Sequence, residues 1–296
     1  MIGLKRSLAK FLILASSCAM TAGLSRAQSP SEIQTTTETG PFCNSPDSVP
    51  QQVPQQTNDP NSTTPTLPER DATWRKLPGN FLQDQKDMWL FPVKLAKGHY
   101  WFPTVLVVGG TGALIGTDPQ TMPHFRQVNG QPNDFHGFDK IFTSTVSGGI
   151  IAAVPATFYA VSLIRKNSYD QGSALLAGEA VVDDTVLMVV MKSITQRLRP
   201  TDVAATGNYS DTFFQSSKSP IGKGTSFPSG HALMSFSVAT VFARRYRQHR
   251  WVPYVAYGLA SVLSFSRVTT GAHFPSDVFV GVALGYVIAR YDVVRQ

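Results

Sequence analysis

Three short segments in the C-terminal half of the chain combine cations, histidines and an aspartate at regular spacings. In the first segment, Lys192 and Arg199 are seven positions apart and Pro200 follows directly. Seven positions are about two turns of an α-helix, so we expect both cations on one face of a helix that ends at Pro200. Two fixed cations on one face suit an oxyanion.

The second segment is the sequence SFPSGH at residues 226–231, and an apolar run follows it. Its proline is a signal for the start of a helix. We therefore expect Ser229 and Gly230 to offer free backbone N–H groups at the positive end of that helix, which is a binding site for anions. His231 can present its imidazole to the same ligand.

The third segment runs from Ser266 to Asp277. His273 and Asp277 are four positions apart around a proline that marks another helix start. We expect Asp277 to accept a hydrogen bond from one ring nitrogen of His273, which fixes the tautomer and leaves the other nitrogen free for nucleophilic attack. Arg267 supplies a third cation, whose planar fork suits phosphate.

Together the segments give the pattern K-x6-R-P, then P-S-G-H, then S-R-x5-H-x3-D. This pattern resembles the signature of the PAP2 (phosphatidic acid phosphatase type 2) and vanadium haloperoxidase superfamily, and every signature position is filled in the family's order. The resemblance covers roughly residues 100–291. It implies an all-α fold, a bundle of about six core helices with the active site at helix ends.

The resemblance also implies a role for each signature residue. His273 would attack phosphorus and become a phosphohistidine, Asp277 would orient His273, and His231 would protonate the leaving oxygen and then activate water. The phosphate would be bound by Lys192, Arg199, Ser229, Gly230 and Arg267. We expect no metal or other cofactor, because three cations and helix-end amides can neutralise the phosphate, although vanadate could occupy the same site.

The function that follows is a metal-independent phosphatase acting on phosphate monoesters or lipid (di)phosphates, of the acid phosphatase or phosphatidate phosphatase kind. Its substrate would be a phosphorylated lipid or a small molecule, and the sequence leaves this choice open. One alternative is a vanadate-dependent haloperoxidase, for which the chain is small. Another is a non-catalytic envelope protein with a retained anion pocket, against which the intact set of His231, His273 and Asp277 argues.

The formal charge of +7 is a weak indication of an acidic partner. Four of the 26 basic residues lie in the first 26 positions, which contain no acidic residue. The rest of the chain has 22 basic against 19 acidic residues, a net charge of only +3. There is no basic stripe interleaved with aromatic residues, so we do not expect nucleic-acid binding.

The apolar stretches that must position the three segments have a helical rather than an alternating pattern. They lie at about 102–117, 140–164, 172–198, 229–246, 251–266 and 276–291, and order is expected to begin near residue 74. Turn-like pairs such as Asp118-Pro119 separate them. The sequence therefore predicts six helices in one all-α domain over residues 73–296.

The preceding residues are expected to lie outside this domain. Residues 1–27 have the pattern of a secretory signal peptide, with three basic residues before a short apolar run at 11–22 and small residues near a cleavage site at 27. Residues 28–72 are rich in Pro, Gln, Ser and Thr, so they cannot bury enough apolar surface to offset the entropy of ordering. We expect them to be a disordered tether.

The signal predicts export into a bacterial cell envelope. A periplasmic domain, soluble or attached to a membrane surface, is favoured over an integral inner-membrane protein. Several of the predicted helices, such as those at 251–266 and 276–291, are shorter than the roughly 20 residues that a span requires. With an exported residue 28, six spans would also place the basic loop at 244–250 outside, against the positive-inside tendency.

Overall fold

The computed structural model describes residues 70, 72–125, 135–204, 207–220 and 224–294. Over these residues the chain is helical and contains no β-strand. The elements are α2 (Leu77–Trp89), α3 (Phe91–Ala96), α4 (Trp101–Phe125), α5 (His136–Ile141), α6 (Ser144–Arg165), α7 (Ser168–Thr195), the 3-10 helix η1 (Pro200–Asp202), α8 (Gly230–Arg245), α9 (Trp251–Thr269), α10 (Pro275–Val287) and the π-helical turn η2 (Ile288–Val293). The predicted signal peptide and nearly all of the predicted tether lie outside the described residues.

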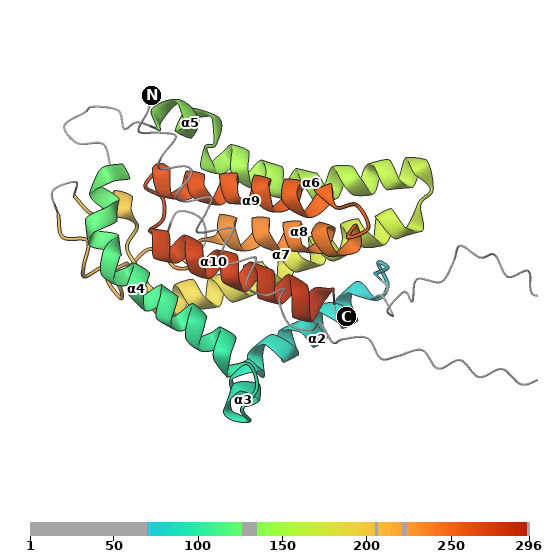
Figure 1. Ribbon diagram of the computed structural model, residues 1–296, viewed down its shortest axis with the longest axis horizontal. Helices are drawn as coiled ribbons and strands as arrows, with labels where there is room; N and C mark the ends of the chain where they lie inside the picture. Colours follow the sequence, from blue (N-terminus) through green and yellow to red (C-terminus); the bar gives the residue numbers. More distant parts are fainter. Residues whose placement is uncertain (1–69, 71, 126–134, 205–206, 221–223, 295–296) are drawn as a thin grey trace, which may run out of the picture. The chain divides into compact units, whose positions relative to one another are not determined.

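Helices α4 and α6 to α10 correspond to the six predicted helices and confirm the all-α fold. Helix α2, which is as long as α10, was not predicted. Helix α8 occupies the middle of the arrangement, where it packs against α7, α9 and α10 (Figure 1). Its sequence is apolar around most of its circumference, which is typical of a buried helix, and most of its residues are buried. The N-terminus of α8 carries the second signature segment, so this segment is held by the centre of the fold.

Helices α6 and α7 are joined by a two-residue connection whose geometry is set locally. Helix α6 ends at Arg165 and is followed by Lys166, which has a left-handed backbone with φ 52°. The side chain of Asn167 then caps α7 by accepting hydrogen bonds from the N–H groups of Tyr169 and Asp170. This turn makes α6 and α7 neighbours, and both reach the cavity described below.

The prediction of a turn at Asp118-Pro119 is wrong, because α4 continues through Pro119 and Pro123 to Phe125. Proline removes one backbone hydrogen bond from a helix, which usually ends or kinks it. Here the Asp118 side chain is buried and bonded to groups of two distant segments, the residues around Arg197 and the start of α10. These tertiary bonds compensate for the local penalty, and no local pattern reveals them.

Two glycines allow α10 to lie directly on the backbone of α8. A Cβ atom at Gly281 would come within 2.6 Å of the Ser229 carbonyl oxygen, and one at Gly285 within 2.2 Å of the Leu233 carbonyl oxygen. Ser237 Oγ also donates to the Gly285 carbonyl oxygen at 2.9 Å. This close approach fixes the start of α10, which carries Asp277, relative to the start of α8.

Large apolar side chains remain exposed along the outer faces of α4, α6 and α9. Phe102 is 81% exposed, Ile164 82% and Tyr254 79%. Among the described helices, only α6 is both long enough and apolar enough to cross a membrane, and little of its apolar window is buried. Large exposed apolar side chains, where they lie together on a surface, are typical of sites that contact a membrane or another protein.

Candidate active site

A cavity of about 440 Å³ lies where the C-terminal end of α7 and the N-terminal ends of α6 and α8 meet the segments around α9 and α10. The structure brings six of the predicted site residues together in its lining: Lys192, Arg199, Gly230, His231, Arg267 and His273. Two others, Ser229 and Asp277, are fully buried behind the lining. The signature segments therefore converge on one site.

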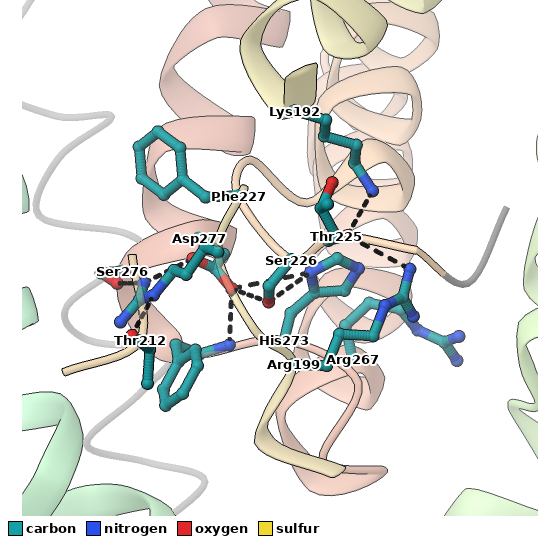
Figure 2. A network of polar contacts seen from close by, with 12 residues as sticks. Lys192, Arg199, Thr212, Thr225, Ser226, Phe227, Arg267, His273, Ser276 and Asp277 are labelled. Atoms are coloured by element: carbon teal, nitrogen blue, oxygen red, sulfur yellow. Dashed lines mark hydrogen bonds and ion pairs between the residues drawn. The ribbon is translucent and has the colours of Figure 1, made fainter. Parts of the chain in front are cut away.

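Lys192 and Arg199 meet at a single carbonyl oxygen. Lys192 Nζ donates to the Thr225 oxygen at 2.8 Å, and Arg199 Nη2 donates to the same oxygen at 3.4 Å (Figure 2). The predicted reason for their proximity is wrong, because α7 ends at Thr195 and Gln196 has a left-handed backbone with φ 42°. Arg199 lies beyond the helix in an extended conformation, and the chain's turn brings it back toward Lys192.

Arg267 is fully buried and is held by the corner between α5 and α6. Its Nη1 donates to Ser144 Oγ at 2.9 Å, and its Nη2 donates to the Phe142 carbonyl oxygen and to Ser147 Oγ. Burial, more than the neighbouring charges, lowers the pKa of Arg267 to about 10, so the guanidinium stays charged at neutral pH. The sequence analysis did not identify this corner as part of the site.

The same corner positions His231. Its Nε2 lies 3.1 Å from the Ser144 carbonyl oxygen, and this acceptor requires a proton on Nε2. Burial, followed by the charge of Arg267, lowers the pKa of His231 to about 4. The ring is therefore neutral at pH 7 while the cavity holds only protein groups.

His273 reaches Asp277 through Ser226 rather than directly. The distance from His273 Nδ1 to Asp277 Oδ2 is 3.7 Å, too long for the direct hydrogen bond that we predicted. Ser226 Oγ donates to Asp277 Oδ2 and lies 3.4 Å from His273 Nδ1 (Figure 2). Because the hydroxyl proton goes to Asp277, Oγ accepts from a proton on Nδ1. Nε2 of His273 then carries the free lone pair.

The charges around this group set its protonation. Burial raises the pKa of Asp277, but the charge of Arg197, the nearby His273 ring and the hydrogen bond from Ser226 outweigh it and lower the pKa to about 2. The Phe274 N–H also donates to Asp277 Oδ2 at 2.9 Å, at the start of α10. Burial lowers the pKa of His273 to about 3, so the ring is neutral. A neutral imidazole beside a carboxylate is the state that a nucleophile requires.

The prediction that Ser229 and Gly230 offer free backbone N–H groups to an anion is wrong for Ser229. The Ser229 N–H donates to the Asp277 carbonyl oxygen at 3.0 Å, so it is not free for an anion. Its Oγ is buried and has no hydrogen-bond partner among the described residues. Gly230 begins α8 and lines the cavity as predicted. A Cβ atom there would come within 2.3 Å of Met188 Sδ, so glycine also permits this close approach.

Arg197 is a site residue that the sequence analysis missed. It is only 1% exposed, and its Nη1 donates to Asp277 Oδ1 at 2.6 Å. Its Nη2 donates to Asp118 Oδ2 at 2.8 Å. The only sequence signal was an extra arginine two positions before Arg199, and a lone arginine near a helix end is usually a solvated charge.

A cluster of acidic residues lies outside the lining of the cavity. Asp84, Glu179 and Asp183 are buried with ligand-type atoms within 4.8 Å of one another, although the sequence predicted no such grouping. Arg70 enters the cluster, with Nη1 2.7 Å from Asp84 Oδ2 and Nη2 3.2 Å from Glu179 Oε1. Burial raises the pKa of Glu179 and of Asp183 to about 7 each. Arg70, predicted to belong to the tether, is therefore ion paired with α2 and α7.

Comparison with known proteins matches residues 171–294 to the PAP2 superfamily. The lipid A 1-phosphatase of Porphyromonas gingivalis is 29% identical over 121 residues, which are 38% of this chain and 23% of the relative. The decaprenylphosphoryl-5-phosphoribose phosphatase of Mycobacterium tuberculosis is 33% identical over 114 residues, which are 38% of this chain and 56% of the relative. The chain thus spans about half or less of the length of these two relatives.

Among solved structures, the chain resembles a transmembrane PAP2 type phosphatidylglycerolphosphate phosphatase from Bacillus subtilis. The two are 20% identical, the match covers 70% of this chain and 92% of the other, and the TM-score is 0.38. The match to the family includes all three signature segments and every site residue predicted from the sequence, but not the corner between α5 and α6.

Proposed function

We propose, from the match of residues 171–294 to the PAP2 superfamily, that the chain is a phosphatase of this family that hydrolyses a phosphate ester through a phosphohistidine at His273. The observation that carries the proposal is a single cavity in which three cations, Lys192, Arg199 and Arg267, face two neutral histidines. Phosphoryl transfer depends mainly on positioning and charge neutralisation. Such a cavity can supply both with protein groups alone.

In the first step, Nε2 of His273 attacks phosphorus. A P–N bond forms while the P–O bond to the leaving group breaks. Nδ1 keeps its proton, which points to Ser226, and the buried Asp277 carboxylate offsets the positive charge that develops on the ring. The charge on the phosphoryl oxygens is shared by the three cations, which are fixed before the substrate arrives.

His231 transfers protons in both steps, first to the leaving oxygen and then from the attacking water. Its pKa of about 4 reflects burial and the nearby cations, and a bound phosphate offsets those cations and raises it. A monoester monoanion carries a proton with a pKa near 6, which can pass to His231 and then to the leaving oxygen. In the second step, water attacks phosphorus, His231 takes one water proton, the P–N bond breaks and inorganic phosphate leaves.

We propose a phosphorylated lipid at a membrane as the substrate, ahead of a soluble monoester. The remaining lining of the cavity is largely apolar and includes Ile151, Val181 and Met188. Helix α6 forms one wall, and its outer face exposes Ile150 and Val154. A lipid can place its head group on the cations and its chains along this surface, whereas a soluble ester gains nothing there. The names of both curated relatives also refer to lipid phosphates.

Phosphate release from phosphatidic acid in detergent micelles, compared with glycerol 3-phosphate, tests both parts of the proposal. We expect kcat/KM to be at least about 100-fold higher for the lipid, equivalent to burying a few methylene groups. His273→Ala serves as the inactive control. Equal values for the two substrates would overturn the lipid assignment. Release no greater than that of His273→Ala from either substrate would overturn the phosphatase assignment.

A further inference from the structure

Behind the cavity, a buried chain of charges continues past Asp277. Arg197 Nη1 donates to Asp277 Oδ1 at 2.6 Å and to Ser276 Oγ at 2.7 Å, and its Nη2 donates to Asp118 Oδ2 at 2.8 Å. Asp118 and Asp277 are both fully buried. The two carboxylates therefore share one guanidinium, and α4 is connected to the catalytic aspartate.

Two aromatic rings and a threonine hydroxyl also hold the Arg197 side chain in this position. Its guanidinium carbon lies 4.4 Å from the ring centre of Phe213 and 3.9 Å from that of Phe274. Its Nε donates to Thr212 Oγ1 at 3.0 Å. Arg197 does not line the cavity, so it cannot bind the phosphate itself. Its effect on the reaction must pass through Asp277.

The two carboxylate oxygens of Asp277 have different hydrogen-bond partners. Oδ1 accepts from Arg197, while Oδ2 accepts from Ser226 Oγ and from the Phe274 N–H and faces His273. The bond at Oδ1 therefore fixes the rotation of the carboxylate that presents Oδ2. It also supplies the cation without which burial would favour a neutral carboxyl group.

We propose that Arg197 is a positioning residue that keeps Asp277 charged and aimed through Ser226 at His273, and that Asp118 moderates this effect by sharing the guanidinium. The proposal rests on the phosphatase function proposed above. The charged or titratable groups that face Asp277 are Arg197 and His273 in contact, Asp118 beyond Arg197, and Lys192 and Arg199 across the site. Of these, Arg197 and Asp118 can be changed without altering the lining of the cavity.

The two substitutions have effects of opposite sign. In Arg197→Met, the cation is lost, Asp277 binds a proton more readily, and the acidic limb of the kcat profile moves to higher pH. In Asp118→Asn, a competing negative charge is removed, so Asp277 binds a proton less readily and the acidic limb moves to lower pH. If Arg197 and Asp118 only stabilised the fold, neither substitution would shift the acidic limb of the kcat profile, even if the protein lost stability.

The experiment compares wild type, Arg197→Met, Arg197→Lys and Asp118→Asn in pH profiles with p-nitrophenyl phosphate. For Arg197→Met we expect kcat to fall on the order of 100-fold at neutral pH with KM within about threefold, and the acidic limb to rise by at least one pH unit. Arg197→Lys should restore part of kcat, because one ammonium can serve one carboxylate. Arg245→Met is the matched control, since Arg245 is also buried, stacks on an aromatic ring at 4.1 Å and lies away from the cavity.

A second readout does not depend on turnover. In protein labelled with 15N-histidine, the Nδ1 and Nε2 signals of His273, assigned by their loss in His273→Ala, report the tautomer and the bond to Ser226. We expect Arg197→Met to shift both signals and Arg245→Met to leave them unchanged. Unchanged His273 signals and an unmoved acidic limb in Arg197→Met would overturn the proposal. A wild type that hydrolyses no ester would overturn the proposed function instead, and the NMR comparison would still decide the role of Arg197.

Discussion

Lys192 should give the site an alkaline limit near pH 8. Burial, followed by the charge of Arg199, lowers its pKa from the ordinary 10.5 to about 8, although Asp277 acts in the opposite direction. The difference corresponds to a net destabilisation of the charged amine by about 3 kcal/mol, most of it from burial. Lys192 is 3% exposed, so solvent does little to screen this cost. Above pH 8 the free enzyme increasingly holds a neutral amine that cannot bind phosphate as a cation.

The expected change in phosphate affinity follows from the titration of Lys192. Each pH unit above 8 reduces the charged fraction about tenfold, so the inhibition constant of inorganic phosphate should rise about tenfold per unit. The same loss of charge should appear as an alkaline limb, a fall of kcat/KM above pH 8. The fall of kcat should lie at higher pH, because bound phosphate stabilises the ammonium. Lys192→Arg should remove the limb, since a guanidinium stays charged in this range. Lys192→Met should weaken the binding of inorganic phosphate about 10- to 100-fold at pH 7, and its inhibition constant should then show no further rise near pH 8.

The assay is competitive inhibition of p-nitrophenyl phosphate hydrolysis by inorganic phosphate between about pH 7.5 and 9.5. Above about pH 8 inorganic phosphate is almost entirely a dianion, so its own titration contributes little where the Lys192 limb is expected. The reasoning is refuted if Lys192→Arg keeps the same alkaline limb as wild type. In that case another group produces the limb, and the buried amine is not the titrating cation.

Three further predictions address other parts of the site and fold. His231→Ala should reduce turnover of alkyl phosphates far more than that of p-nitrophenyl phosphate, whose leaving group needs no proton, and equal losses would argue against a general acid. Dialysis against EDTA should leave turnover unchanged, and a loss that Mg²⁺ or Zn²⁺ restores would contradict the account. Gly285→Ala should destabilise the fold by about 1–3 kcal/mol in thermal unfolding, because its Cβ would meet the Leu233 backbone at 2.2 Å. Gly258→Ala in α9 is the control, since a Cβ there meets nothing within 4 Å and should stabilise slightly.

The parts of the fold that the sequence predicted well depend on local signals. Helix α8 was expected at 229–246 and lies at Gly230–Arg245, because a proline and a glycine precede a long apolar run. Helix α10 begins at Pro275, with Asp277 in its first turn, as the third segment indicated. These starts place His231 and His273, so the two histidines could be predicted from sequence alone.

The parts that could not be predicted depend on contacts between distant residues. Arg197 lies 80 positions from Asp277 and 79 from Asp118, and no periodic pattern connects them. Arg199 reaches Lys192 through a turn at Gln196 rather than along a helix face. Ser226 was visible in the second segment, but its place between His273 and Asp277 required the fold. Local patterns thus identified the charged and imidazole groups that line the cavity but not the groups that hold them in place.

The central claim is that His273 forms a covalent bond to phosphorus. The most direct test is rapid mixing of 32P-labelled substrate with His231→Ala, in which hydrolysis of the intermediate should be slow, followed by a denaturing alkaline quench that preserves phosphohistidine. The account predicts protein-bound label that is stable to alkali, labile to acid, located on the peptide containing His273 and absent from the double variant with His273→Ala. Turnover of an aryl phosphate by His231→Ala without any label on the protein at any time would contradict it.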